Sequence, residues 1–489
     1  MTDLHEVAKA FRESMPRTGH VSIFRIDQLD RTGIPVVQAN LILPDEPATI
    51  GYGYGFQPIE AEVGALGELC EEVHVHAWVK QAERILGSRA ELVRRHGERG
   101  VVDPLTLCLP AGSAYSPEMP LTWVWGQRLS GEPVLVPREW VAAYPYQLGE
   151  EKPRLITPIT NGLGAGFDLP HAIAHGLMEA LQRDGNVVTY RALDQGVVVE
   201  PDAVEEEDVA ALLEHLGRLG IGVRIKLACT DFGIPNLYVV GDDQGEPTAP
   251  VQVTSCGEAA HPDRARSLRK ALLEFCGSRA RKAATHGPIE TVSAAMPRDY
   301  VERQMKVAML EEEENRALEA MAEWVGQDAA ELRRRLGGSV FAERRRVRLS
   351  DLPTVPAAGI ADSGARLDLL VQRLAAETLE PIVVDCSPAR GPVKVVKTIV
   401  PGLESETMSY HRIGWRGVRR LRARQDPLIL DAPRDGARRV RLRPEDEARA
   451  GGPAWFDAAE ADRIVGSLYP LYRESGPFSA QLHRQRRAA

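Results

Sequence analysis

The sequence predicts an α+β fold in which sheets pack against helices. Strand-like runs alternate with longer helical patterns throughout the chain, and no flexible Gly/Ser linker interrupts them. The 489 residues, with 44% hydrophobic and 26% charged side chains, have the composition of a globular protein with a large core.

Each element is expected where its residue pattern is strongest. Strands are expected where short apolar runs contain β-branched residues, at 35–43, 187–191, 222–230, 236–240, 381–385 and 393–400. Helices are expected where apolar residues recur every three or four positions, at 58–80, 169–183, 206–219, 263–284 and 301–336. After residue 402 the chain is rich in arginine, and we expect it to be irregular, with a frayed basic end at 483–487.

Charge and cysteine usage exclude several functional classes. The net charge is −9 and the pI about 5.8, whereas general nucleic-acid binding needs a basic surplus. No run of about 18 apolar residues is present, and the N-terminal residues contain no apolar signal core. The six cysteines form no CxxC pair, which argues against a cysteine zinc site and favours a reduced compartment. We therefore expect a cytoplasmic protein with no nucleic-acid partner and no membrane partner.

One motif occurs three times in the predicted helices. Each copy has a small residue, then Leu, one further residue and Glu, followed by apolar positions. The copies lie at 65–72, 176–183 and 271–279, and their glutamates are Glu68, Glu179 and Glu274. A glutamate among apolar residues is costly to bury without compensation, so three of them suggest a shared cation or a cationic partner.

A glycine-rich segment precedes the first two copies at the same distance. Thirteen residues separate Gly55 from Glu68, and thirteen separate Gly166 from Glu179. A glycine-rich turn that opens onto a helix N-terminus offers backbone N–H groups and a favourable dipole to phosphate. The spacing therefore favours a phosphate site that is built twice.

The same helices present oxygen ligands on one face. Glu68 is followed three residues later by Glu71, and such a pair shares a helix face. The second helix repeats the pair as Glu179 and Gln182. Such oxygens suit Mg²⁺, which usually bridges a protein and nucleotide phosphates. No P-loop pattern and no kinase glycine loop are present, so these motifs alone do not identify the nucleotide.

At these residues the chain resembles the YcaO family. Residues 32–37 are similar to its early GIPV strand, and 53–55 with 64–72 are similar to its GKG segment and SAxxExxER helix. Residues 160–166 with 172–183 are similar to its SNGxAxG and HALxExxER element. Residues 261–263 with 271–279 are similar to HxD and RALxEaxQSR, and 392–403 to PVVRVVVPGL. The stretches follow the family's order and cover about residues 20 to 420.

The resemblance implies a YcaO-like fold with an ATP and Mg²⁺ site between helices of a pseudo-repeated core. Family members phosphorylate a peptide amide oxygen, and a thiol or hydroxyl, an external sulfide or a backbone amine then gives an azoline, a thioamide or an amidine. The residues that match the family's metal ligands are Glu68, Glu71, Glu179 and Gln182, and the catalytic set is Glu68, Glu179, Arg183 and Arg279. The nucleotide-binding set is Gly53, Gly55, Asn161, Gly164, Ala165, Arg183, Glu274 and Arg279.

The resemblance also implies a division of the chain. Residues 1–50 form an N-terminal strand region, 51–300 the ATP- and Mg²⁺-binding core, 301–350 a charged helical insertion, 351–420 the C-terminal part of the same domain, and 421–489 an Arg-rich extension.

Four positions depart from the family pattern and leave two alternatives open. Gln182 stands where Glu is usual, and Glu72, Gly277 and Tyr54 stand where Arg, Gln and Lys are usual. One alternative is therefore a nucleotide-binding but catalytically degenerate scaffold for a modifying partner. The other is a metalloprotein that uses His171, His175 and Glu179, because their spacing places them on one helix face.

The ends of the chain bear on partners and product. The family's azoline-forming members end in a proline-rich tail, which is absent here, and the stretch before about residue 20 is too short for a leader-binding module. We expect a peptide substrate, a thioamide before other products, and a homodimer. A TfuA-like protein is the expected partner for a thioamide, and a leader-binding protein resembling a ubiquitin-activating enzyme for an azoline.

Overall fold

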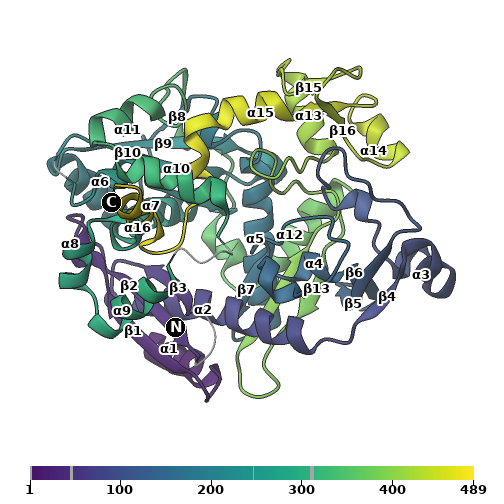
Figure 1. Ribbon diagram of the computed structural model, residues 1–489, viewed down its shortest axis with the longest axis horizontal. Helices are drawn as coiled ribbons and strands as arrows, with labels where there is room; N and C mark the ends of the chain where they lie inside the picture. The colour runs from purple at the N-terminus through teal and green to yellow at the C-terminus, as the bar shows by residue number, and fades with distance from the viewer. Residues whose placement is uncertain (1–2, 44–47, 246, 309–312, 489) are drawn as a thin grey trace. The chain divides into compact units, whose positions relative to one another are not determined.

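The computed structural model describes residues 3–43, 48–245, 247–308 and 313–488. Contacts divide the chain into two compact units, which we call unit 1 and unit 2. Unit 1 consists of Met1–Leu69, Thr189–Val355 and Val465–Ala489, and unit 2 of Cys70–Val188 and Pro356–Ile464. Both contain sheets with helices packed on them, so the predicted α+β class is confirmed (Figure 1). The predicted division of the chain into five successive segments, from 1–50 to 421–489, remains a proposal.

Unit 1 contains two sheets among its described residues. The first is antiparallel with the order β1-β2-β3, formed by His20–Arg25, Val36–Ile42 and Thr49–Tyr54. The second has the order β11-β10-β9-β8-β12, and in chain order its strands β8 to β12 are Val197–Glu200, Ile221–Cys229, Asn236–Asp243, Cys256–Ala260 and Arg345–Arg348. Only β8 and β12 are paired in parallel in this described sheet. Strands β2, β9 and β10 confirm three of the predicted ranges.

Helix α7, Arg264–His286, supports the second sheet by lying against β10 and β11. It begins where the Asp263 side chain accepts a hydrogen bond from the Ala265 N–H, and Ala271 and Phe275 on it are fully buried. Helix α6, Glu207–Arg218, lies against β9, and helix α2, Pro58–Gln81, follows β3. All three helices confirm predicted ranges.

The predicted helix at 301–336 is wrong as one element. The structure contains α9 Arg298–Val307, α10 Asn315–Val325 and α11 Ala329–Leu336. Helix α10 ends at Gly326, and the Asp328 side chain caps α11 by accepting from the Glu331 N–H, so the chain has separate stop and start signals. In the acidic run at 311–314, Glu311 and Glu312 lie outside the described residues.

The basic end of the chain is helical rather than frayed. Helix α16, Ser479–Ala488, packs against α10, and His483 and Arg487 both pair with Glu319. The other helices of unit 1 are α1 Leu4–Ser14 and α8 Ile289–Ala295.

Unit 2 is organised around an antiparallel sheet with the order β4-β5-β13-β14-β7, and β6 pairs with β5. Its strands β4 to β7, β13 and β14 are Ile85–Ser88, Pro120–Arg128, Pro133–Pro137, Leu163–Gly166, Ile382–Asp385 and Lys394–Ile399. Helix α5, Leu169–Asn186, lies against β7 and β14, and α12, Ser363–Ala376, lies against α5. The shorter helices are α3 Arg89–His96 and α4 Arg138–Val141. The strand predicted at 187–191 is wrong: α5 ends at Asn186, residues 187–190 form a turn and bend, and a 3-10 helix begins at Arg191.

The Arg-rich segment after residue 402 is folded, which corrects the prediction. It forms helices α13 Trp415–Ala423, α14 Pro444–Arg449 and α15 Ala458–Val465, and strands β15 Ile429–Leu430, β16 Ala437–Arg439 and β17 Trp455–Asp457. Arg419 and Arg449 lie over the Trp415 ring, and Arg416 is buried against Asp184. Arginine side chains therefore pack here where sequence patterns expect apolar ones.

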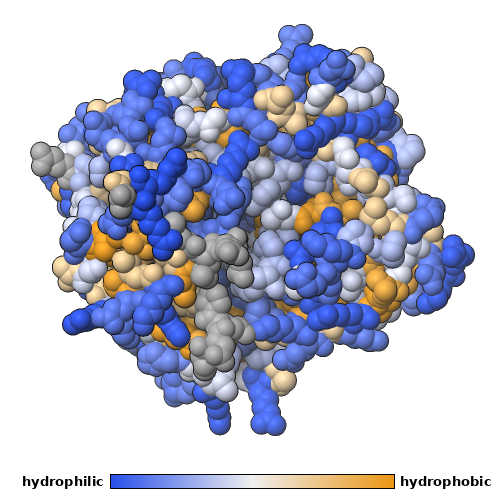
Figure 2. Space-filling view, in the orientation of Figure 1, coloured by the Kyte–Doolittle hydropathy of each residue, from blue (hydrophilic) through white to orange (hydrophobic). Residues whose placement is uncertain are grey.

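The surface is that of an ordinary globular protein. On the face shown in Figure 2, hydrophilic side chains predominate and hydrophobic ones form small scattered groups. None of the helices in the described ranges is long and apolar enough to cross a membrane.

Candidate functional site

In unit 1, helix α2 lies directly against strand β3 because both have small residues, glycine and alanine, at the contact. A Cβ atom on Gly53 would be 2.0 Å from the Ala61 carbonyl oxygen and 2.2 Å from the Ala65 nitrogen. One turn after Ala65, the Glu68 carboxylate accepts a hydrogen bond from the Tyr52 N–H. The small residue of the motif thus permits the close approach, and the glutamate is held by the strand backbone.

Unit 2 repeats this arrangement with helix α5 and strand β7. A Cβ atom on Gly164 would be 2.1 Å from the Ala172 carbonyl oxygen and 3.0 Å from the Gly176 nitrogen. One turn after Gly176, Glu179 accepts a hydrogen bond of 2.8 Å from the Gly162 N–H. Gly162 has φ +85°, which favours glycine at that turn.

The third copy of the motif, in unit 1, uses helix α7 and strand β11. A Cβ atom on Gly257 would be 2.1 Å from both the Ala271 carbonyl oxygen and the Phe275 nitrogen. Glu274 accepts a hydrogen bond of 3.0 Å from the Tyr54 hydroxyl. The three copies therefore share the strand–helix packing, and in the third a side-chain hydroxyl donates to the glutamate.

The glycines have a packing role that the sequence did not predict. Gly53 lies in β3, and Gly164 and Ala165 lie in β7, so they are strand residues rather than part of a turn. Gly55 follows β3, and a Cβ atom there would be 2.5 Å from the Glu60 Cβ. Their contact with phosphate stays a prediction.

The two predicted arginines have different surroundings. The Arg279 side chain is fully buried in unit 1, with Nη2 at 2.9 Å from Asp30 and 2.8 Å from Asp243. Two carboxylates thus balance its charge, which supports a structural role, and its action on phosphate stays a prediction. Arg183 is 30% exposed in unit 2, where its Nη2 lies 3.4 Å from the Glu179 carboxylate.

Two further metal candidates, Glu71 and Gln182, and the departure Glu72 lie in unit 2. The Glu71 Oε1 atom lies 4.0 Å from the His175 Nε2 atom. Gln182, on helix α5, is buried. The Glu72 carboxylate, at a position where Arg is usual, accepts a hydrogen bond from the Tyr144 hydroxyl.

The donor set fits Mg²⁺ better than zinc. In the described ranges no three His, Cys, Asp or Glu side chains are grouped so that they could hold a metal ion by themselves. The alternative of a site at His171, His175 and Glu179 stays a prediction; burial lowers the pKa of His171 and keeps its imidazole neutral. Mg²⁺ needs only one or two carboxylates, because phosphate oxygens and water complete its coordination.

Among the buried charged residues that sequence patterns did not indicate, Lys397 and Glu258 lie on strands that pack near the motif helices. Lys397 on β14 is 2% exposed and donates a hydrogen bond of 2.8 Å to the Ile159 carbonyl oxygen. Burial lowers its pKa to about 8, and the nearby carboxylate of Glu179 opposes that shift. Glu258 on β11 in unit 1 is 6% exposed and pairs with Arg191 at 3.3 Å. A charged residue within a strand of mostly apolar and small residues could have indicated both positions from the sequence.

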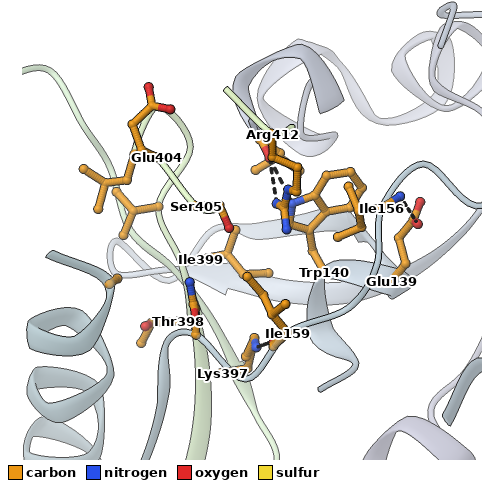
Figure 3. Close-up of a pocket in the computed structure, with 15 residues that line it drawn as sticks. Glu139, Trp140, Ile156, Ile159, Lys397, Thr398, Ile399, Glu404, Ser405 and Arg412 are labelled. Atoms are coloured by element: carbon orange, nitrogen blue, oxygen red, sulfur yellow. Dashed lines mark hydrogen bonds between the residues drawn. The ribbon is translucent and has the colours of Figure 1, made fainter. Parts of the chain in front are cut away.

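Lys397 also lines a cavity of about 70 Å³ in unit 2, together with Asn161. Figure 3 shows Lys397 pointing toward Ile159, with the Trp140 ring in the same wall. Asn161 immediately precedes Gly162, so this cavity adjoins the backbone that holds Glu179.

Lys397→Met is expected to remove a pH dependence of stability. The folded-state pKa of about 8 lies below the ordinary lysine value of 10.5, so the unfolded chain binds more protons between these pH values. The wild type should therefore gain up to about 3 kcal/mol relative to Lys397→Met between pH 8 and 10.5, and lose that gain as the pH falls through 8. Urea unfolding across this range is the measurement, with Lys394→Met on the same strand as control. Equal slopes for wild type and Lys397→Met would contradict the assignment.

Comparison with known proteins identifies the family. A family model described as YcaO cyclodehydratase, ATP- and Mg²⁺-binding, matches residues 52–404. The chain therefore belongs to the YcaO family, and the predicted resemblance is confirmed. The family supports ATP-dependent peptide modification in general, with ATP and Mg²⁺ as cofactors, as predicted.

Two relatives agree with this assignment. An uncharacterized protein of Methanothermobacter thermautotrophicus is 28% identical over 421 residues, which cover 84% of this chain and 96% of the relative. An uncharacterized protein in the tfuA 3' region of Rhizobium leguminosarum bv. trifolii is 26% identical over 312 residues, or 62% of this chain and 66% of the relative.

Two solved structures share the fold. A heterocyclase in complex with substrate and cofactor has a TM-score of 0.63 at 16% identity, and the match covers 87% of this chain but only 56% of the heterocyclase chain. YcaO from Methanopyrus kandleri, bound with AMPPCP and Mg²⁺, has a TM-score of 0.58 at 22% identity and covers 84% and 94%. These likenesses confirm the predicted YcaO-like fold.

Proposed function

We propose that this protein uses ATP to phosphorylate a backbone amide oxygen of a peptide, so that a nucleophile can replace that oxygen. The observation that carries the proposal is the repeated arrangement in which a strand glycine packs on a helix and a backbone N–H holds a glutamate. It occurs with Glu68 in unit 1 and with Glu179 in unit 2, within a chain of the YcaO family.

Each proposed residue has a part that follows from its chemistry. The proposed Mg²⁺ ligands are Glu68, Glu71, Glu179 and Gln182. A Mg²⁺ ion held by their side-chain oxygens would neutralise charge on the nucleotide phosphates. Arg183 would stabilise charge on the transferred phosphoryl group, since guanidinium pairs well with phosphate oxygens. Asn161 would contact the nucleotide from the loop before Gly162, and Glu274 from helix α7.

The proposal predicts nucleotide binding by the purified protein. Calorimetry should detect ATP or a non-hydrolysable analogue binding with a Kd below the millimolar range when Mg²⁺ is present, and more weakly without Mg²⁺, because carboxylates repel free phosphate. Absence of binding in the millimolar range would contradict the proposed function. Binding without phosphate release on every peptide tried would instead favour the degenerate scaffold.

We propose a thioamide as the product, formed with a TfuA-like partner that delivers sulfur. A relative of this chain lies in a tfuA 3' region, which supports such a partner. In this reaction the amide oxygen leaves with the phosphoryl group and sulfide sulfur takes its place.

The product is decided by mass spectrometry of the treated peptide. A gain of roughly 16 daltons means that oxygen has been exchanged for sulfur, whereas a loss of roughly 18 daltons means ring closure or amidine formation, given activation of the amide oxygen. Water loss with enzyme, ATP and peptide alone would overturn the thioamide and leave the amide activation intact.

A further inference from the structure

Two of the departures from the family pattern are in contact with each other in unit 1. Tyr54 stands where Lys is usual, and Gly277 stands where Gln is usual. A Cβ atom on Gly277 would be 2.8 Å from the Tyr54 Cδ1 and 3.2 Å from its Cβ. The Tyr54 ring therefore occupies the space that any side chain at position 277 would need.

The Tyr54 hydroxyl has a defined acceptor. It donates a hydrogen bond of 3.0 Å to the Glu274 carboxylate, one turn before Gly277 on helix α7. Burial, followed by the charge and hydrogen bond of Glu274, raises the pKa of Tyr54 well above its ordinary value, and Glu68 and Glu258 add to this. The phenol is therefore a neutral donor at physiological pH, where a lysine would bring a positive charge.

We propose that Tyr54 is a positioning residue that holds the Glu274 carboxylate in one orientation for nucleotide binding, and that it can do so only because position 277 carries no side chain. This inference rests on the proposed function, since Glu274 is a proposed nucleotide contact. A lysine here would add a positive charge beside Glu274, Glu68 and Glu258, and the neutral phenol adds none. Nucleotide affinity should therefore depend more steeply on Mg²⁺ than in a variant with lysine at position 54.

Tyr54→Phe separates the hydroxyl from the ring. The phenylalanine ring still fills the space at Gly277, but the Glu274 carboxylate loses the hydrogen bond from the hydroxyl. The Kd for Mg·ATP should rise about tenfold, the range expected for a hydrogen bond to a charged group. Tyr300→Phe is the matched control, because Tyr300 is also buried in unit 1, where its ring lies 5.2 Å from that of Phe24. It should change the Kd by less than about twofold. An unchanged Kd in Tyr54→Phe would overturn the positioning role.

A double-mutant cycle tests the coupling without nucleotide. Gly277→Gln alone should lower the melting temperature, because the new side chain collides with the Tyr54 ring. The same change in a Tyr54→Lys background should cost at least about 3 °C less, since contacting residues couple. Additive changes in melting temperature would contradict the coupling between Tyr54 and Gly277. If the wild type bound no Mg·ATP, the proposed function and the positioning role would both fall, whereas the thermal cycle would still report on the pair.

The pair also predicts a rescue that a purely structural contact would not give. The double variant Tyr54→Lys with Gly277→Gln, which has the usual family residues, should bind Mg·ATP within about threefold of the wild type. Its affinity should depend less steeply on Mg²⁺ concentration, because lysine supplies a positive charge. An unchanged Mg²⁺ dependence would overturn the charge argument.

Discussion

Replacing Glu179 with alanine is expected to abolish Mg²⁺- and ATP-dependent turnover. The carboxylate is proposed to bind Mg²⁺, and it also accepts the Gly162 N–H and lies 3.4 Å from Arg183. Because Gln182 already replaces one carboxylate of the usual set, only three negative ligands remain, and losing one more should reduce kcat/KM at least about 100-fold. Phosphate release in the presence of a peptide substrate is the measurement. Full turnover would show that the metal assignment is wrong.

Two further variants separate the backbone contact from the metal charge. Glu179→Gln keeps an acceptor for Gly162 but removes the negative charge, so it should fold like the wild type and lose the same activity. Gln182→Glu adds a carboxylate to the proposed set, and we expect it to retain turnover and to bind Mg²⁺ more tightly. Loss of folding in Glu179→Gln would instead assign Glu179 a structural role.

Asp184→Asn is expected to cause the largest loss of stability among the changes considered. Asp184 is fully buried in unit 2, where it lies 3.1 Å from Arg416, pairs with Arg420 and accepts a hydrogen bond from the Glu404 N–H. Removal of its charge takes this buried carboxylate away from both guanidinium groups, and breaking such a buried pair costs about 3–5 kcal/mol. Urea unfolding of the purified variant is the measurement.

A matched surface pair provides the control. Asp431 lies 2.7 Å from Arg422 in the same unit, but its side chain is 86% exposed. Asp431→Asn should change the free energy of unfolding by less than about 1 kcal/mol, because water and salt screen exposed pairs. Similar losses in Asp184→Asn and Asp431→Asn would show that burial does not determine the stability of these pairs.

The sequence predicted the helices that carry the site because their signals are local. Helix α7 follows the capping residue Asp263, and α5 follows Asp168, whose side chain accepts from the His171 N–H. The repeat of small residue, Leu and Glu could be found because it recurs in the sequence. The physical reason for the repeat could not be found in the sequence, because it depends on which strand glycine packs against each helix.

The missed features depend on contacts between distant residues. Arg279 looked available for phosphate, but it binds Asp30, 249 residues away, and Asp243, 36 residues away. Lys397 donates to Ile159, 238 residues away. The folded segment after residue 402 was missed because arginine stacking and buried ion pairs replace the apolar periodicity on which helix prediction relies.

Helix α7 receives its counter-charge from the segment Val465–Ala489. Glu474 there pairs with Lys282, Arg281 and His286, and the neighbouring cations lower the pKa of Glu474 well below its ordinary value although burial opposes this. In a growing chain, this carboxylate is synthesised about 190 residues after the helix that needs it, which at ribosomal rates is roughly 10 to 40 s later. During that interval the three basic side chains have no acidic neighbour from this segment. Completion of unit 1 thus waits until this late segment has been synthesised.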